Sequence, residues 1–103
     1  MSEPTNGRRL YKVHGSRAIA EAFWQIQRRA LREGRGPEVV SALQQLRHRL
    51  QRNPTKLGEP LYRLAALRME IRTVILGPLV VDFGVCKDRP LVFIKGVTLL
   101  AKS

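Results

Sequence analysis

The chain is 103 residues long, which is enough for one domain that buries roughly two-thirds of its unfolded surface. Its 19 lysines and arginines outnumber 8 aspartates and glutamates, and the formal net charge of +11 favours a polyanionic partner or an acidic protein partner. Its apolar runs fall short of the roughly 18 residues that span a bilayer, so a membrane-spanning helix is excluded.

Residues 1–7 are polar and lack the apolar core of a signal peptide, so we expect a disordered lead-in before a single domain at residues 8–103. Cys86 is the one cysteine, which allows no intramolecular disulfide and fits a reducing compartment. We therefore expect a cytoplasmic protein that does not bind membranes. The excess of arginine over lysine favours bidentate recognition of phosphate, although a GC-rich genome or plain solubility charge also explains a basic chain.

The first part of the domain is predicted to form a short strand and two helices. Residues 8–14 suit an edge strand, and Ser16 is a favourable N-cap for a helix over residues 17–33. The Gly-Arg-Gly segment at 34–36 ends that helix, and a second helix follows over residues 37–51. Both helices have apolar residues at helical spacing. They are predicted to form an antiparallel hairpin that covers a sheet.

The second part is predicted to form a meander of three antiparallel strands, at residues 67–76, 79–85 and 91–100. Each run is rich in Val, Ile, Leu and Phe, and turn-forming residues separate the runs. Residues 56–66 contain Pro and Gly and are expected to form a connecting loop. The predicted fold is therefore α+β, in the order β-α-α-β-β-β, with the short strand and the helical hairpin packed on an antiparallel sheet.

The sequence gives little support to metal or cofactor chemistry. His14, His48 and Cys86 do not have the spacing of metal ligands, and the histidines are typical of surface residues. Cys86 follows an apolar strand and is typical of a small buried hydrophobe. The glycines match neither the P-loop nor the dinucleotide-binding motif. We therefore expect neither a metal nor a cofactor.

Cationic residues are the best candidates for a site. If Arg68 and Arg72 share one face of a strand, as their even spacing indicates, they could bind successive phosphates or stabilise a phosphorane without metal. Alternatively, they are surface arginines that pair with Glu70. Trp24 and Tyr62 are candidates to stack on bases, although Trp24 at its helical position is more typical of a core residue.

The order of these elements resembles the RelE/ParE superfamily of toxins from bacterial toxin–antitoxin pairs. The resemblance lies in the Lys-Leu-Gly segment at 56–58, the Leu-Arg-Met-Glu-Ile-Arg run at 67–72, and the Val- and Ile-rich runs at 79–85 and 91–95. It covers nearly the whole chain and implies a helical hairpin that packs on a twisted antiparallel sheet.

RelE-type members cut mRNA in the ribosomal A site with basic residues and no metal. By matching position, the resemblance implies that Lys56 contacts phosphate and that Arg68 or Arg72 stabilises the transition state. Further basic residues are expected to bind nucleic acid: Arg63, Lys95, Lys102, Arg47, Arg49 and Arg52. The ribonuclease branch usually has a basic run and a tyrosine after the last strand. Residues 97–103 have no tyrosine, and only Lys95 and Lys102 could substitute for the basic run.

The resemblance leaves alternatives open. ParE-type members share the scaffold but inhibit DNA gyrase by protein–protein contact, and a third possibility is a basic domain that binds RNA or the ribosome without cutting. Any toxin of this kind implies a cognate acidic antitoxin, whose amphipathic segment covers the basic sheet and the helix grooves. The high net charge serves that pairing as well as it serves nucleic acid.

Overall fold

The computed structural model describes residues 10–101. This part of the chain has an α+β fold with two helices and a five-stranded mixed sheet. The elements in chain order are β1 (Lys12–His14), α1 (Arg17–Arg32), α2 (Gly36–Arg52), a 3-10 helix (Pro54–Lys56), β2 (Glu59–Leu64), a second 3-10 helix (Ala65–Leu67), β3 (Met69–Leu76), β4 (Leu79–Cys86) and β5 (Leu91–Leu99).

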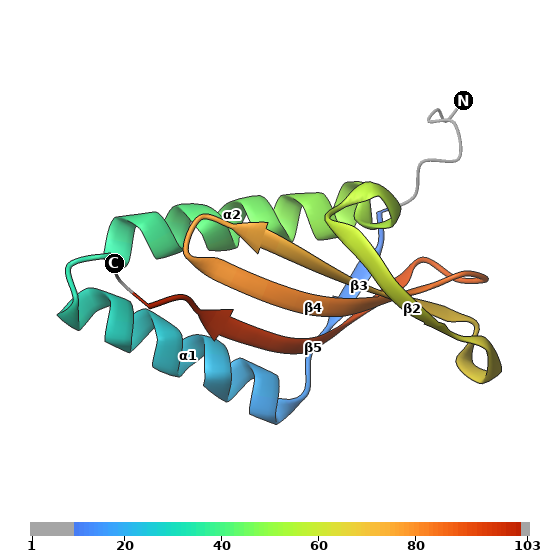
Figure 1. Ribbon diagram of the computed structural model, residues 1–103, viewed down its shortest axis with the longest axis horizontal. Coiled ribbons are helices and arrows are strands. Elements are labelled where there is room, and N and C mark those ends of the chain that lie inside the picture. Colours follow the sequence, from blue (N-terminus) through green and yellow to red (C-terminus); the bar gives the residue numbers. More distant parts are fainter. Residues whose placement is uncertain (1–9, 102–103) are drawn as a thin grey trace.

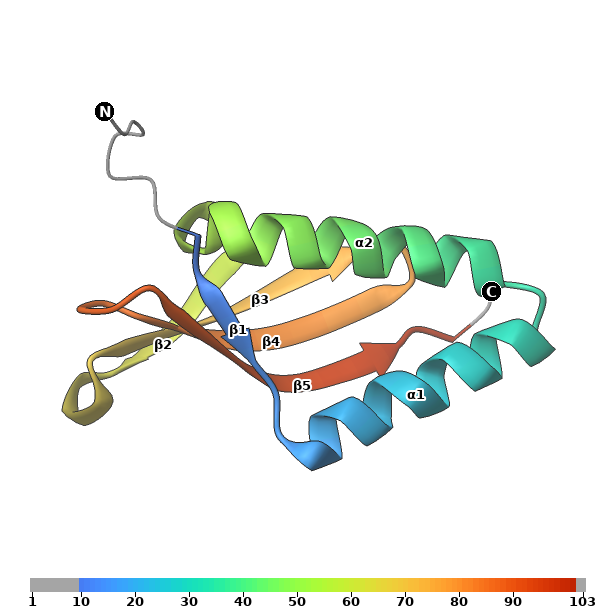
Figure 2. The ribbon, with the colours of Figure 1, turned by 180° about the vertical axis from the view of Figure 1, so that it is seen from behind.

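The strand order in the sheet is β1-β5-β4-β3-β2, and the last four strands in the chain pair antiparallel with their neighbours. β1, which lies at the β5 edge of the sheet (Figure 2), instead runs parallel to β5. Val13 pairs with Val92. The prediction of an antiparallel sheet is therefore wrong for its first strand. The reason is that residue alternation defines the two faces of a strand, whereas it does not encode the direction of its neighbour.

The two helices pack against one face of the sheet. Alternate residues of β4, among them Leu79, Val81 and Phe83, point to this face and are fully buried in a cluster with the apolar side of α2, including Leu46 and Leu50. The helices approach each other at their connecting turn and diverge toward their other ends (Figure 1). Within the described residues, no α-helix covers the opposite face of the sheet, which we call the helix-free face. None of the helices in residues 10–101 is long and apolar enough to cross a membrane.

The predicted helices are confirmed, with ends that differ by one residue. The side chain of Ser16 accepts a hydrogen bond of 3.2 Å from the backbone N–H of Ile19, as expected for an N-cap. Gly34 has a φ of 74° and allows the chain to reverse between the helices. Trp24, in contrast, is 54% exposed on the helical hairpin, so its expected place in the core is wrong. Its neighbour Phe23 packs against the core instead.

The segment expected to be a loop at 56–66 contains an additional strand. β2 (Glu59–Leu64) pairs antiparallel with β3 at the edge of the sheet, so the sheet gains a strand that the sequence did not predict. Nearly every residue of β2 is exposed, and so it lacks the alternation of apolar and polar residues that identifies a half-buried strand. Pro60 is tolerated because an edge strand has one side without pairing partners, and the register shifts next to it.

β3 begins two residues later than predicted. Leu67 ends a 3-10 helix, and Arg68 follows it in the left-handed conformation with a φ of 50°. Arg68 therefore lies outside the strand and does not share a strand face with Arg72, which corrects the expected pair. The expected lead-in at residues 1–7 lies outside the described residues.

Candidate functional site

Arg72, a predicted catalytic residue, is buried on the side of β3 that faces the helices. Its side chain is 8% exposed. The Nε atom donates to the carbonyl oxygen of Leu57 at 2.9 Å, and Nη2 donates to that of Gly58 at 3.1 Å. Nη1 donates to Oε1 of Glu70 at 2.8 Å. Because each nitrogen of the guanidinium already has a partner within the protein, Arg72 is placed to hold the backbone at Leu57 and Gly58 rather than to contact a substrate.

Lys56 lies at the end of the 3-10 helix that follows α2, and its side chain lines a pocket of about 270 Å³. The other residues around this pocket come mainly from the last turns of α2: His48, Arg49, Arg52, Asn53 and Leu57. Among the described residues no carboxylate lines the pocket. The structure thus brings together three of the predicted cations, and a phosphate is the type of ligand that such a group attracts.

The backbone next to Lys56 is fixed by contacts with the core and with β3. Leu57 is 4% exposed and belongs to the hydrophobic core, while its carbonyl oxygen is bound by Arg72. Gly58 has a φ of 67°, and a Cβ atom at this position would lie 2.0 Å from the carbonyl oxygen of Thr73. Only glycine fits such a close approach in a left-handed conformation. Lys56 is therefore mounted on a fixed segment, which lowers the conformational cost of binding an anion.

Other predicted cations lie at the opposite end of β2. Arg63 and Arg68 line a pocket of about 220 Å³ together with Lys87. The side chain of Arg68 is 69% exposed, and its Nε lies 3.4 Å from Oδ2 of Asp88. Because β2 separates these residues from Lys56, they form a second basic surface apart from the pocket around Lys56.

Lys95 projects from a third place, the helix-free face of the sheet. The register between β4 and β5 shifts next to it, because Asp82 pairs with Gly96 and Phe83 pairs with Ile94. Its Nζ atom lies 2.9 Å from the hydroxyl oxygen of Tyr62. Lys102 lies outside the described residues, and so its predicted role has no structural counterpart.

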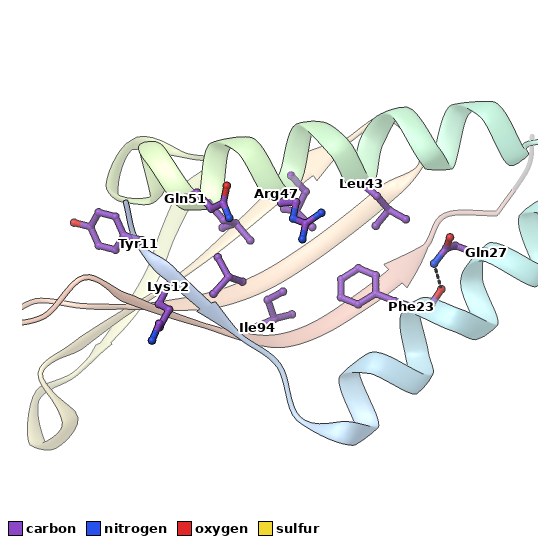
Figure 3. A pocket seen from close by; sticks show the side chains of 11 residues that line it. Tyr11, Lys12, Phe23, Gln27, Leu43, Arg47, Gln51 and Ile94 are labelled. Carbon is purple, nitrogen blue, oxygen red and sulfur yellow. Dashed lines mark hydrogen bonds between the residues drawn. The ribbon is translucent and has the colours of Figure 1, made fainter. Parts of the chain in front are cut away.

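Arg47 faces a groove between the diverging helices. The groove has a volume of about 500 Å³ and reaches from α1 across to α2 and β1 (Figure 3). Its apolar residues include Phe23, Leu43 and Ile94, and Lys12 and Arg47 add positive charge to its lining. Such a combination suits an amphipathic segment with acidic residues.

The residues considered for metal or thiol chemistry are placed as follows. Cys86 is buried, as predicted for a small hydrophobe. His14 is exposed at the edge of the sheet, and His48 is exposed on α2. In residues 10–101 there is no group of His, Cys, Asp and Glu side chains that could hold a metal ion.

Sequence reasoning missed the role of Arg35, which is 6% exposed. Its Nη1 donates to the carbonyl oxygen of Leu100 at 2.8 Å, and its Nε donates to Oε1 of Glu33 at 3.1 Å. Hydrogen bonds from Arg29 and then from Arg35 hold the pKa of the Glu33 carboxyl below its usual value. Arg35 lies between two glycines in the turn that connects α1 and α2, and nothing in this local sequence indicates that its side chain is buried. The contact with Leu100 could not be predicted because it joins segments far apart in the chain.

The pocket around Lys56 is the strongest candidate site, because three predicted cations converge there on a rigid segment. His48 also lines this pocket, although the sequence did not predict it as part of the site. It lies one helical turn before Arg52 on α2, and this spacing is the sequence feature that could have predicted its position beside Arg52. Comparisons with known proteins give no match to a protein family, to a curated protein or to a solved structure.

Proposed function

We propose that the chain is the toxin of a type II toxin–antitoxin module of the RelE/ParE type, and that it cleaves ribosome-bound mRNA without a metal ion. The order of elements supports this, because a helical hairpin precedes the antiparallel strands β3, β4 and β5 and packs on their sheet. The net charge of +11 fits an RNA target. The observation that carries the proposal is the pocket in which Lys56, Arg49 and Arg52 converge.

The chemistry of this cleavage needs charge stabilisation more than a metal. The ribose 2′-oxygen bonds to the neighbouring phosphorus, and the bond from phosphorus to the 5′-oxygen breaks, which leaves a 2′,3′-cyclic phosphate and a 5′-hydroxyl. The 2′-hydroxyl loses its proton to solvent, and the departing 5′-oxygen takes one from water. In the proposed site, Lys56 and Arg52 stabilise the negative charge that develops on the phosphoryl oxygens. Arg72 contributes by holding the backbone beside Lys56.

The proposed antitoxin is an acidic protein with an amphipathic segment. Its apolar residues would cover Phe23 and Leu43 in the groove between the helices, and its carboxylates would meet Arg47 and Lys12 at the same groove (Figure 3). Opposite net charges on the two proteins would also accelerate their association.

The test is expression of the chain without an antitoxin, followed by measurement of growth and by mapping of mRNA ends on ribosomes. Wild-type protein should arrest growth and truncate ribosome-bound mRNA, and Lys56→Ala should relieve both effects. Arg17→Ala is the matched control, because Arg17 is an exposed cation at the start of α1 and lies away from the pocket.

Other outcomes would replace the proposal. Intact mRNA together with DNA breaks and an SOS response would indicate the DNA gyrase inhibitor. Harmless overexpression, with a purified protein that binds RNA in a salt-sensitive way, would indicate a non-catalytic RNA- or ribosome-binding domain.

A further inference from the structure

A continuous row of residues crosses the sheet from one edge to the other. Tyr62 of β2 pairs with Ile71 of β3, Ile71 pairs with Gly84 of β4, Gly84 pairs with Phe93 of β5, and Phe93 pairs with His14 of β1. Residues that pair directly across strands point to the same face. This aromatic row lies on the helix-free face, since the neighbouring residues of each central strand point into the core beneath the helices.

The centre of the aromatic row forms an apolar floor. Gly84 has no side chain, and a Cβ atom there would lie 2.5 Å from Sδ of Met69 and 3.0 Å from Cδ1 of Ile71. The side chains of Met69 and Ile71 therefore lie over β4 in the space that Gly84 leaves. Ile71 is 1% exposed even though none of the helices in residues 10–101 covers this face. The floor at the centre of the aromatic row is therefore closed and apolar.

The rings of the aromatic row are accessible and held in position. Tyr62 is 47% exposed and Phe93 is 36% exposed. The ring of His14 stacks on that of Phe93, with centroids 5.3 Å apart and an angle of 23° between the planes. The Nζ atom of Lys95 lies 5.5 Å from the centroid of the Tyr62 ring and donates a hydrogen bond to its hydroxyl. Rings fixed in this way lose little conformational entropy when a ligand stacks on them.

We propose that the aromatic row is a platform on which unpaired bases of single-stranded RNA stack, at Tyr62 and at Phe93. Strands lie about 4.8 Å apart, so three strand spacings place the backbones of these two residues roughly 14 Å from each other. Lys95 supplies a cation between them for the phosphate backbone. The inference rests on the proposed function in taking RNA as the target, and it adds that the RNA is single-stranded and that this face binds its bases.

Single-stranded RNA is the ligand that these features fit best. In a duplex the bases are stacked and paired, so their flat surfaces are not available to rings that stand on a sheet. Base stacking on aromatic side chains also tolerates any sequence, because every base has a π-face. The exposed cation Lys95 on this face favours an anion, although the half-buried carboxylate of Asp82 shares it.

The test compares two labelled probes of about 12 nucleotides, a single-stranded RNA and an abasic sugar-phosphate chain of equal length, by fluorescence anisotropy with the purified full chain. Tyr62→Leu and Phe93→Leu should each weaken binding to the RNA about fivefold or more, and should leave binding to the abasic chain unchanged. Tyr62→Phe keeps the ring and should retain most of the affinity. Trp24→Leu removes an exposed ring from the helical hairpin and should change neither affinity.

Two results would overturn the platform. One is unchanged RNA affinity in both leucine variants, and the other is an equal loss for RNA and for the abasic chain, because either result would show that the rings do not contact bases. A circular dichroism spectrum like that of wild type would show that each variant is folded. The platform and the proposed cleavage can be tested independently. In a Lys56→Ala background, loss of the Tyr62 or Phe93 ring should still weaken binding to RNA and not to the abasic chain, whether or not the protein cuts mRNA.

Discussion

The Nε atom of Arg72 donates a hydrogen bond of 2.9 Å to the carbonyl oxygen of Leu57, the residue that directly follows Lys56. This contact links Arg72 to the segment that carries Lys56, two of the three residues that the resemblance implied to be catalytic, and it gives these two residues different roles. Lys56 is exposed at the pocket, whereas Arg72 is buried and fixes the backbone next to it. Loss of activity in an Arg72 variant would therefore not by itself show that Arg72 contacts the substrate, because the substitution also removes the hydrogen bonds that fix the backbone next to Lys56.

Arg72→Ala should lower the free energy of unfolding by about 3 kcal/mol, because it leaves Glu70 and two carbonyl groups without their donor in a largely buried place. Urea denaturation followed by circular dichroism would measure the change. Arg68→Ala is the matched control and should stay within about 0.5 kcal/mol of wild type, since the Arg68 side chain is exposed. Equal effects of the two substitutions would contradict the bracing role of Arg72.

Lys56→Ala should weaken RNA binding and reduce the slope of log K against log salt concentration by about 1, as expected when one phosphate contact is lost. Anisotropy titrations over a series of salt concentrations would give the slopes. Arg17→Ala removes the same charge at the start of α1 and should leave the slope close to wild type. A slope that falls equally in both variants would mean that net charge, and not the pocket, determines binding.

Gly58→Ala should destabilise the protein more than Gly34→Ala does. Both glycines have positive φ, and alanine in that conformation costs about 1 kcal/mol on backbone grounds. A Cβ at Gly34 meets no atom within 4 Å, whereas a Cβ at Gly58 would lie 2.0 Å from the backbone oxygen of Thr73. Thermal unfolding would measure the loss of stability in each variant. The loss in Gly34→Ala reports the conformational cost alone, and the additional loss in Gly58→Ala reports the steric cost. Similar losses of stability would show that β3 can move away from Gly58.

The stability that Glu33 contributes should depend on pH. Its pKa is lowered in the folded protein by hydrogen bonds from Arg29 and Arg35, so the contribution is complete above the usual carboxyl pKa of about 4.3 and is lost as pH falls through the folded value. Glu33→Gln should therefore differ most from wild type near neutral pH, and the difference should shrink in acid. Urea denaturation at several pH values would show a constant difference if the carboxylate were not involved.

The sequence predicted the elements that have a clear apolar pattern: helical spacing in the two helices, and runs of Val, Ile, Leu and Phe between turns in the strands. The helices and the strands β4 and β5 have apolar residues that lie against one core, and this pattern is visible without a structure. β2 could not be predicted in the same way, because exposed residues on an edge strand have no reason to alternate. Its partner β3 was predicted, yet the start of β3 was misplaced because Leu67 is apolar but belongs to a 3-10 helix.

The candidate site was predicted in part, and the difference depends on contacts between distant segments. Lys56, Arg49 and Arg52 lie near one another in the chain, so their convergence could be inferred. The burial of Arg72 could not, because its partners at Leu57 and Gly58 are brought beside it only when β2 pairs with β3. Charge alone does not distinguish an arginine that binds a ligand from one that holds a loop.

The parallel pairing of β1 with β5 has a consequence for how the chain folds as it is synthesised. β1 leaves the ribosome early, but the strand that it joins is translated after both helices and all the other strands. The apolar sides of the helices are also not fully buried until β5 is in place, because Val92 and Leu99 of β5 belong to the same core. The beginning of the domain is therefore among the last parts to be fixed, and a nascent chain exposes its core to other proteins for most of translation.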